Sequence, residues 1–332
     1  MGDVVVGTCS WTDKTMVEAY YPRGVSTPEA RLRYYAERFD TVEVDSSFYA
    51  LPTAANARRW AERTPPGFTF HVKAFGLMTR HTVDERVLPA ELREHEYDLT
   101  DRGRVTRPSP EMVERSFELF REALTPLSDA GKMGGVLMQF PPFFEATGHR
   151  RTMEHLGYLE YAREQLAGLP VFVEFRHPSW AADRLLPEVL AFLSEREMSF
   201  VAVDAPQLPS RTTMPPVTAV TAPWSYVRFH GRNAATWHAR TASAADRFDY
   251  LYTPEELAEW EQPIRDLARD SERTWAMFNN CKRDFAPRNA RDLALVLADV
   301  VAPRAGGALT GDPAHPVDRG PHPGPGQLDL GL

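Results

Sequence analysis

Polar side chains stand near the ends of apolar segments of this sequence, in pairs separated by two residues. The pairs are Glu43 with Asp45, His71 with Lys73, Glu174 with Arg176, and Arg228 with His230. Residues two apart in an extended strand point to the same side, so each pair would present both of its groups to one surface. Carboxylates, imidazoles and cations on one surface can transfer protons, bind an anion or hold a metal ion.

The first chemistry that fits this set uses a metal. Glu174, Asp204 and His230 would be ligands of a divalent metal ion, whose bound water would attack a phosphate ester. Glu43 and Asp45 would then be further ligands or general bases. All five are candidate catalytic residues, and a divalent metal is the cofactor that they imply.

The second chemistry needs no metal. Lys73, Arg176, Arg228 and Arg232 would bind an anionic group while a carboxylate or a histidine moves a proton. Four cations among the same residues oppose occupancy by a metal ion, so the sequence leaves the cofactor open. Other side chains near the segment ends would contact the substrate, by stacking or by hydrogen bonds. They are Trp11, Tyr49 and Asn280.

The segments that carry these residues predict a barrel. Eight short apolar runs are typical of buried strands, and segments of helical period lie between them. The runs span 4–10, 41–46, 68–74, 134–140, 171–177, 199–204, 225–231 and 274–280. Thr-Pro pairs predict helix starts for 27–39 and 253–270, with Thr27 and Thr253 as N-caps. The alternation predicts an α/β fold, a TIM-barrel-like (β/α)8 domain with its site at the C-terminal ends of the strands. An open doubly wound sheet is disfavoured because no Gly-rich phosphate turn follows the first run.

Composition divides the chain into a barrel over 1–302, a flexible Gly/Pro-rich linker over 303–326 and a peptide over 327–332. The connections 76–110 and 231–252 are long for such a fold and predict lids or insertions. The net charge of -8 argues against a surface that binds nucleic acid as a whole. No apolar run approaches the ~20 residues of a membrane span. Two cysteines and the absence of a signal peptide pattern predict a cytoplasmic protein.

Seven stretches in this order resemble the YecE-like family, also catalogued as domain-of-unknown-function family 72. They are GTCSWTDKTMVEAYYP, YYAERFDTVEVDSSFYALP, FTFHVKAF, QFPPFF, VEFRHPSW, YVRFHGRN and FNNCKRDFAPRNA. The resemblance covers about Val4 to Val301 and implies a TIM-barrel-like fold, but no established reaction. The motif residues that it carries over are Thr8, Trp11, Glu43, Ser46, Phe48, Tyr49, Lys73, Gln139, Glu174, Arg176, His177, Trp180, Arg228, His230, Gly231 and Asn280. Asp45 and Cys281 depart from the family's usual Asn and His, which would make the site more able to bind metal.

The last six residues resemble the hexapeptide Gln-Leu-x-Leu-x-Leu, by which bacterial proteins dock on the DNA polymerase sliding clamp. Gln327 would hydrogen-bond at the edge of the clamp's groove, and Leu328, Leu330 and Leu332 would fill apolar pockets. The linker before them would let the barrel reach neighbouring DNA.

The motifs together predict a protein of replication or repair that hydrolyses a phosphodiester or a damaged nucleotide, with the sliding clamp and DNA as partners. One alternative is an isomerase, lyase or hydrolase of a small phosphorylated or carboxylated metabolite, which would use the same cations to bind its substrate. The other alternative is a non-catalytic adaptor that the clamp recruits.

Overall fold

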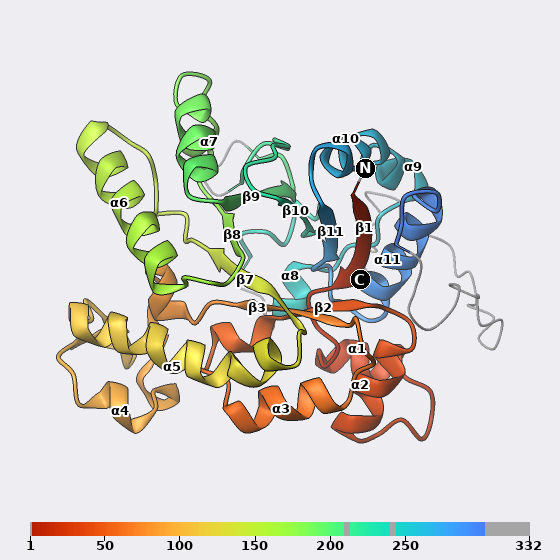
Figure 1. Cartoon of the computed structure of the whole chain (residues 1–332), viewed down its shortest axis with the longest axis horizontal. Coiled ribbons are helices and arrows are strands. Elements are labelled where there is room, and N and C mark those ends of the chain that lie inside the picture. The colour runs from red at the N-terminus through yellow and green to blue at the C-terminus, as the bar shows by residue number, and fades with distance from the viewer. Residues whose placement is uncertain (1, 209–212, 240–243, 303–332) are drawn as a thin grey trace, which may run out of the picture.

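The centre of the molecule is a closed barrel of eight parallel strands (Figure 1), in a computed structural model that describes residues 2–208, 213–239 and 244–302. The strands are β1 (Asp3–Thr8), β2 (Thr41–Val44), β3 (Thr69–Lys73), β7 (Met133–Gln139), β8 (Val171–Glu174), β9 (Met198–Asp204), β10 (Trp224–Phe229) and β11 (Arg273–Phe278). Their order around the barrel is β1-β11-β10-β9-β8-β7-β3-β2, and all neighbours are parallel. The predicted TIM-barrel-like α/β fold is therefore confirmed.

Helices surround the barrel (Figure 1). They are α1 (Lys14–Ala19), α2 (Pro28–Ala36), α3 (Ala54–Glu62), α5 (Pro110–Asp129), α6 (His149–Gln165), α7 (Leu186–Glu195), α8 (Ala244–Arg247), α9 (Pro254–Ala258), α10 (Glu261–Asp270) and α11 (Phe285–Val296). Thr27 caps α2 as predicted, because its hydroxyl accepts a hydrogen bond from the backbone N–H of Ala30. The helix predicted over 253–270 is two helices, α9 and α10. Pro263 has no N–H to continue a helix, and a new start at Glu261 puts it in a first turn, where that donor is not needed.

The connection between β3 and β7 has secondary structure of its own. It contains α4 (Ala90–Arg93) and an antiparallel sheet of β4 (Val83–Asp84), β5 (Asp98–Leu99) and β6 (Arg104–Thr106), in the order β4-β6-β5. We call this segment, residues 76–109, the insertion. It matches the predicted long connection 76–110 and follows directly from the end of β3.

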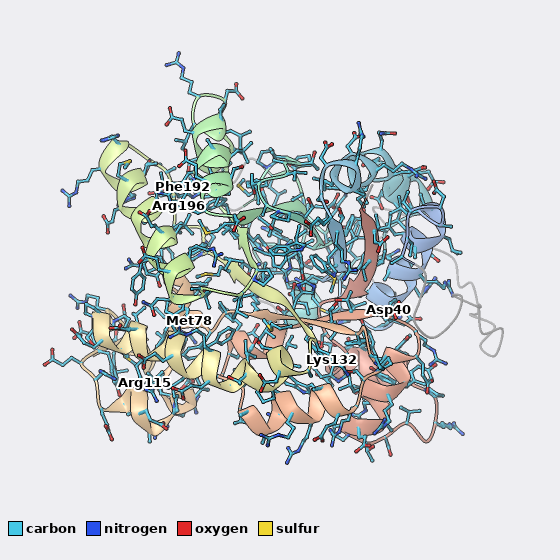
Figure 2. The ribbon with its side chains drawn as sticks, viewed as in Figure 1. Asp40, Met78, Arg115, Lys132, Phe192 and Arg196 are labelled. Atoms are coloured by element: carbon cyan, nitrogen blue, oxygen red, sulfur yellow. The ribbon has the colours of Figure 1, made fainter. Side chains whose placement is uncertain are left out.

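Apolar side chains form two clusters, one between the sheet and the helices and one inside the barrel. Polar bonds also join the layers. Lys132, which is labelled in Figure 2, precedes β7. It donates to the carbonyl oxygens of Ala61 and Thr64, both at 2.6 Å. Arg196 follows α7 and pairs with Glu160 of α6 at 2.7 Å. Among the helices that the structure describes, none has the length and apolar character needed to cross a membrane.

Candidate active site

The alternation of side chains along each strand decides which polar residues can meet inside the barrel. Phe172 on β8 and Tyr226 on β10 belong to the interior cluster. Glu174 and Arg228 stand two residues further along the same strands and therefore share that face. Both lie near the C-terminal ends of their strands, which is where TIM-barrel sites are built.

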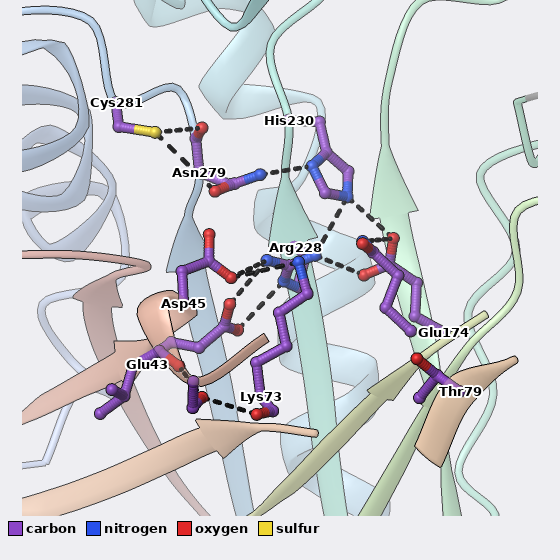
Figure 3. Close-up of polar contacts among 12 residues, drawn as sticks. Glu43, Asp45, Lys73, Thr79, Glu174, Arg228, His230, Asn279 and Cys281 are labelled. Atoms are coloured by element: carbon purple, nitrogen blue, oxygen red, sulfur yellow. Dashed lines mark hydrogen bonds and ion pairs between the residues drawn. The ribbon is translucent and has the colours of Figure 1, made fainter. Parts of the chain in front are cut away.

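Arg228 is the centre of the site and lies between two carboxylates from other strands (Figure 3). Its guanidinium donates to Glu43 through Nη2 at 2.6 Å and through Nε at 3.1 Å, and it donates to Glu174 through Nη1 at 2.6 Å. The Tyr226 hydroxyl donates a further hydrogen bond to Glu43 at 2.9 Å. All four side chains are fully buried. Such forked, charge-assisted bonds fix the orientation of both carboxylates.

His230 extends this network toward the barrel mouth (Figure 3). Its Nε2 lies 3.0 Å from Glu174, and its Nδ1 lies 2.9 Å from the amide nitrogen of Asn279. Because an amide nitrogen only donates, Nδ1 accepts and Nε2 carries the hydrogen that Glu174 accepts. Burial lowers the pKa of His230 to about 4. Burial alone would raise the pKa of Glu174, but the charge of Arg228 and the contact with His230 outweigh it and hold that pKa well below its ordinary value.

Above the buried layer, three charged side chains form a rim that is partly open to solvent. The exposed fractions are 25% for Asp45, 10% for Lys73 and 16% for Arg176. Lys73 pairs with Asp45 at 3.3 Å, and Arg176 donates to Glu174 at 3.2 Å. Tyr49 follows η1 (Asp45–Phe48) with 60% of its surface exposed. The structure thus places all these sequence-predicted residues on the same end of the barrel.

The pKa values of Glu43 and Asp45 are shifted in opposite directions although the two residues are close in sequence. Burial raises the pKa of Glu43 to about 7, and the nearby charge of Asp45 adds to this effect, while the charge of Arg228 acts against it. Burial also acts to raise the pKa of Asp45, but Lys73 and Arg228 outweigh it and lower that pKa. The two carboxyl groups therefore titrate as a pair that gains or loses one proton near neutrality.

Asp204 lies outside this network although it ends a barrel strand. Both of its neighbours in sequence belong to the interior cluster, so its own side chain points to the helix layer. There it accepts hydrogen bonds from Arg232 at 2.7 Å, from the Tyr252 hydroxyl at 2.7 Å and from Trp260 Nε1 at 2.6 Å. Arg232 also pairs with Glu259 at 2.7 Å. These contacts satisfy Asp204 and Arg232 away from the barrel interior.

The predicted metal ligands Glu174, Asp204 and His230 are consequently not brought together. Two of them touch inside the barrel, while Asp204 is on the other side of the sheet. The described residues contain no group of three or more His, Cys, Asp or Glu side chains that could hold a metal ion. The oxygens of Glu174 already accept hydrogen bonds from two arginines, which leaves this carboxylate neutralised without a metal.

Two further predicted substrate contacts also point into the helix layer. Trp11 packs edge-to-face against Trp60 with ring centroids 6.0 Å apart, and it is buried in the outer cluster. Asn280 donates to the side chain of Asn289 at 2.8 Å and to the backbone oxygen of Tyr250 at 2.9 Å. Their contacts hold the loops and helices around the barrel, and they do not face the site.

Three residues outside the candidate catalytic, substrate-binding and metal-ligating sets also belong to the network, although Gln139 is one of the motif residues that the family resemblance carries over. Gln139 donates to Glu174 at 2.7 Å, and Tyr226 and Asn279 make the bonds described above. The two-residue spacing could have found Tyr226, which precedes the central arginine by two positions. Side chains alternate along β11 in the same way, and Trp275 and Met277 belong to the interior cluster. The alternation therefore predicts that Asn279, and not Asn280, faces the barrel interior.

Comparison with known proteins places the chain in a family. The curated protein "UPF0759 protein YunF" of Bacillus subtilis (strain 168) is 29% identical over 308 residues, which are 91% of this chain and 98% of the relative. A DUF72 family protein of Thermotoga maritima MSB8 superposes with a TM-score of 0.70 at 29% identity, over 89% of this chain and 99% of that one. One of Enterococcus faecalis V583 does so with a TM-score of 0.70 at 26% identity, over 89% and 95%. The family model "Protein of unknown function DUF72" matches residues 5–308, and the chain belongs to this family.

Proposed function

We propose that the barrel mouth is the active site of an enzyme that moves a proton on a small phosphorylated or carboxylated substrate. The observation that carries this proposal is the pair of Glu43 and Asp45. One carboxyl group is buried with a pKa of about 7, and the other reaches the partly open rim. A group with a pKa near the working pH is both a competent acid and a competent base.

Each residue of the site has a defined part in this proposal. Asp45 contacts the substrate and exchanges the proton that the pair with Glu43 holds. Lys73 and Arg176 bind the anionic group of the substrate, since both are cations on the rim. Arg228 holds the carboxylates in place and stays out of contact with the substrate, because it is fully buried. The reaction classes that use this arrangement are isomerase, lyase and hydrolase.

The test is a screen of small phosphate esters and carboxylic acids in deuterium oxide, followed by NMR, with a chelator present throughout. We expect proton exchange or turnover of at least one compound, and we expect Glu43→Gln to slow it about 100-fold or more. Lys73→Ala should raise KM, since its side chain binds the anion. Glu91→Gln changes an exposed carboxylate on α4 and is the matched control. Full activity in Glu43→Gln, or activity that returns only when a divalent metal is added back, would contradict the proposal.

A second candidate function follows from one observation in the sequence, the six residues Gln327–Leu332. They support recruitment of the protein to DNA by the sliding clamp, with a phosphodiester or a damaged nucleotide as substrate. These residues lie outside the described part of the chain. The cations Lys73 and Arg176 suit a phosphodiester as well as a small phosphate ester. Clamp binding separates the two candidates.

A further inference from the structure

The insertion brings a histidine to the rim of the site. Directly after β3 the chain forms η2 (Gly76–Thr79), and Arg80 then adopts a left-handed conformation with φ of 63°. This turn leads to His81, whose ring packs edge-on against Phe48 with centroids 4.8 Å apart. The ammonium of Lys73 lies over the same Phe48 ring at 4.7 Å. Lys73, a cation of the rim, and His81 therefore both contact the Phe48 ring.

The two ring nitrogens of His81 differ in their surroundings. Nδ1 lies 2.9 Å from the Thr79 hydroxyl, which fixes the orientation of the ring. Within the described residues, no hydrogen bond is formed by Nε2. The ring nitrogens of His71 are buried without a partner, whereas Nε2 of His81 is not buried in this way and is partly open to solvent. A ligand that reaches Nε2 can therefore supply the partner that this nitrogen does not have.

Burial and positive charges act on His81. Burial lowers its pKa to about 3, and the cations Lys73, Arg176 and Arg104 contribute in the same direction, while a hydrogen bond with the backbone of Thr79 acts against them. These groups come from β3, from the loop after β8 and from the insertion itself. An anion bound among them would reverse the effect, because it would screen the cations and favour the protonated imidazole.

Counting charges shows which anion suits the rim. Of the three rim side chains, Lys73 and Arg176 are cations and Asp45 is an anion, so the rim itself carries one net positive charge while His81 is neutral. Arg104 lies outside the rim, and its guanidinium donates to Thr82. A singly charged carboxylate balances that rim as it stands. A doubly charged phosphoryl or sulfate group leaves one negative charge uncompensated, and a proton on His81 would compensate it.

We propose that His81 completes an anion site with Lys73 and Arg176, and that this site takes a doubly charged phosphoryl-type group with uptake of one proton by His81. The inference rests on the proposed function, because it uses the same two cations for the substrate's anionic group. It narrows the substrate class from phosphorylated or carboxylated compounds to phosphate monoesters. It also gives the insertion a role, which is to position His81.

The experiment is calorimetric titration of the full chain with sulfate, a dianion that does not itself titrate near neutral pH. Titrations in two buffers of different ionisation enthalpy give the number of protons taken up. The comparison is made at about pH 5.5, where Glu43 is already protonated, and again at about pH 8. For the unaltered protein we expect proton uptake and affinity about tenfold higher at the lower pH.

His81→Gln should abolish the proton uptake and weaken sulfate binding about tenfold at the lower pH, with little change at about pH 8. His95→Gln is the matched control. His95 belongs to the same insertion, but its charge adds to the hydrogen bonds that lower the pKa of Glu111, and it is not among the groups that act on His81. Acetate, a monoanion, should bind more weakly than sulfate and take up no proton on this histidine. The same uptake in His81→Gln as in the unaltered protein, equal affinity for acetate and sulfate, or no sulfate binding at all would overturn the inference.

The outcomes also separate this inference from the proposed function. Sulfate binding does not require turnover. A protein that binds sulfate with His81-dependent proton uptake, but shows no proton transfer in the substrate screen, would overturn the proposed function and support the anion site. Turnover that depends on Glu43, together with unchanged sulfate binding and proton uptake in His81→Gln, would support the proposed function and overturn the anion site.

Discussion

Arg228 shows that the interior of this barrel is organised around charge. Its guanidinium joins Glu43 of β2 to Glu174 of β8, and the side chains of all three are fully buried. Burying charges costs desolvation free energy, and well-packed apolar residues of the same volume would often stabilise a fold as much or more. The ion network beside the apolar cluster of the barrel interior therefore does not owe its presence to stability, and the chemistry proposed for the site would account for it.

His71 is a second buried polar residue of the interior, one layer below the site, and it yields a prediction on stability. Its ring packs against Trp275 at 4.5 Å and Tyr226 at 5.0 Å, and neither ring nitrogen has a hydrogen-bond partner within the described residues. Burial lowers its pKa from 6.5 to about 3. Between these values the unfolded chain binds a proton that the folded protein does not, so this contribution to stability is lost as the pH falls below 6.5.

We therefore expect His71→Leu to reduce the dependence of the unfolding free energy on pH. One proton corresponds to about 1.4 kcal/mol per pH unit, and the slope should fall by about that amount between about pH 6 and pH 4. Urea denaturation at a series of pH values measures it. His149→Leu, at the exposed start of α6, should leave the slope unchanged. An unaltered slope in His71→Leu would show that the folded protein binds a proton at this site.

At the scale of elements, β9 carries a carboxylate, Asp204, that binds side chains of the surrounding helix layer and does not belong to the site inside the barrel. Asp204 ties this strand to the segment after β10 and to α9 and its neighbours, through Arg232, Tyr252 and Trp260. Asp204→Asn removes the charge that these donors share, and we expect it to lower the free energy of unfolding by roughly 3 kcal/mol. Sulfate affinity and proton uptake at the barrel mouth should not change.

Chemical denaturation and calorimetry on the same variant check this prediction together. Asp266→Asn, a change of a half-exposed carboxylate on α10, should cost little stability and serves as the control. A variant of Asp204 that keeps its stability but loses sulfate binding or activity would instead put this residue in the site.

The sequence predicted most of the barrel because each strand is an apolar run and the helices between them carry recognisable caps such as Thr27. It predicted much of the site because polar pairs two residues apart share a face, as in Arg228 and His230. It did not place Asp204 correctly. Every residue of β9 is buried, so the sequence of this strand does not show which of its side chains point into the barrel and which point to the helices. It also gave no indication of His81, because only the tertiary turn after β3 brings the insertion back to the rim.

At the scale of the whole molecule, the sequence joins an acidic chain to a segment that resembles a clamp-binding peptide. The net charge of -8 opposes strong binding of the protein to DNA by its surface alone. Attachment to a clamp would replace that binding, because a tethered protein acts at a high effective concentration on the neighbouring DNA. The two candidate functions therefore differ in whether residues 327–332 matter.

We expect the full chain to bind a bacterial sliding clamp with a micromolar or lower Kd in a fluorescence titration, and the chain lacking residues 327–332 not to bind. A chain of unchanged length with Gln327→Ala, Leu328→Ala and Leu330→Ala is the matched control, and it should also fail to bind. This result would direct the substrate screen to phosphodiesters and damaged nucleotides. Equal binding with and without the peptide, or no binding by the full chain, would remove the clamp from the account and leave the small anionic substrate as the function that the barrel mouth supports.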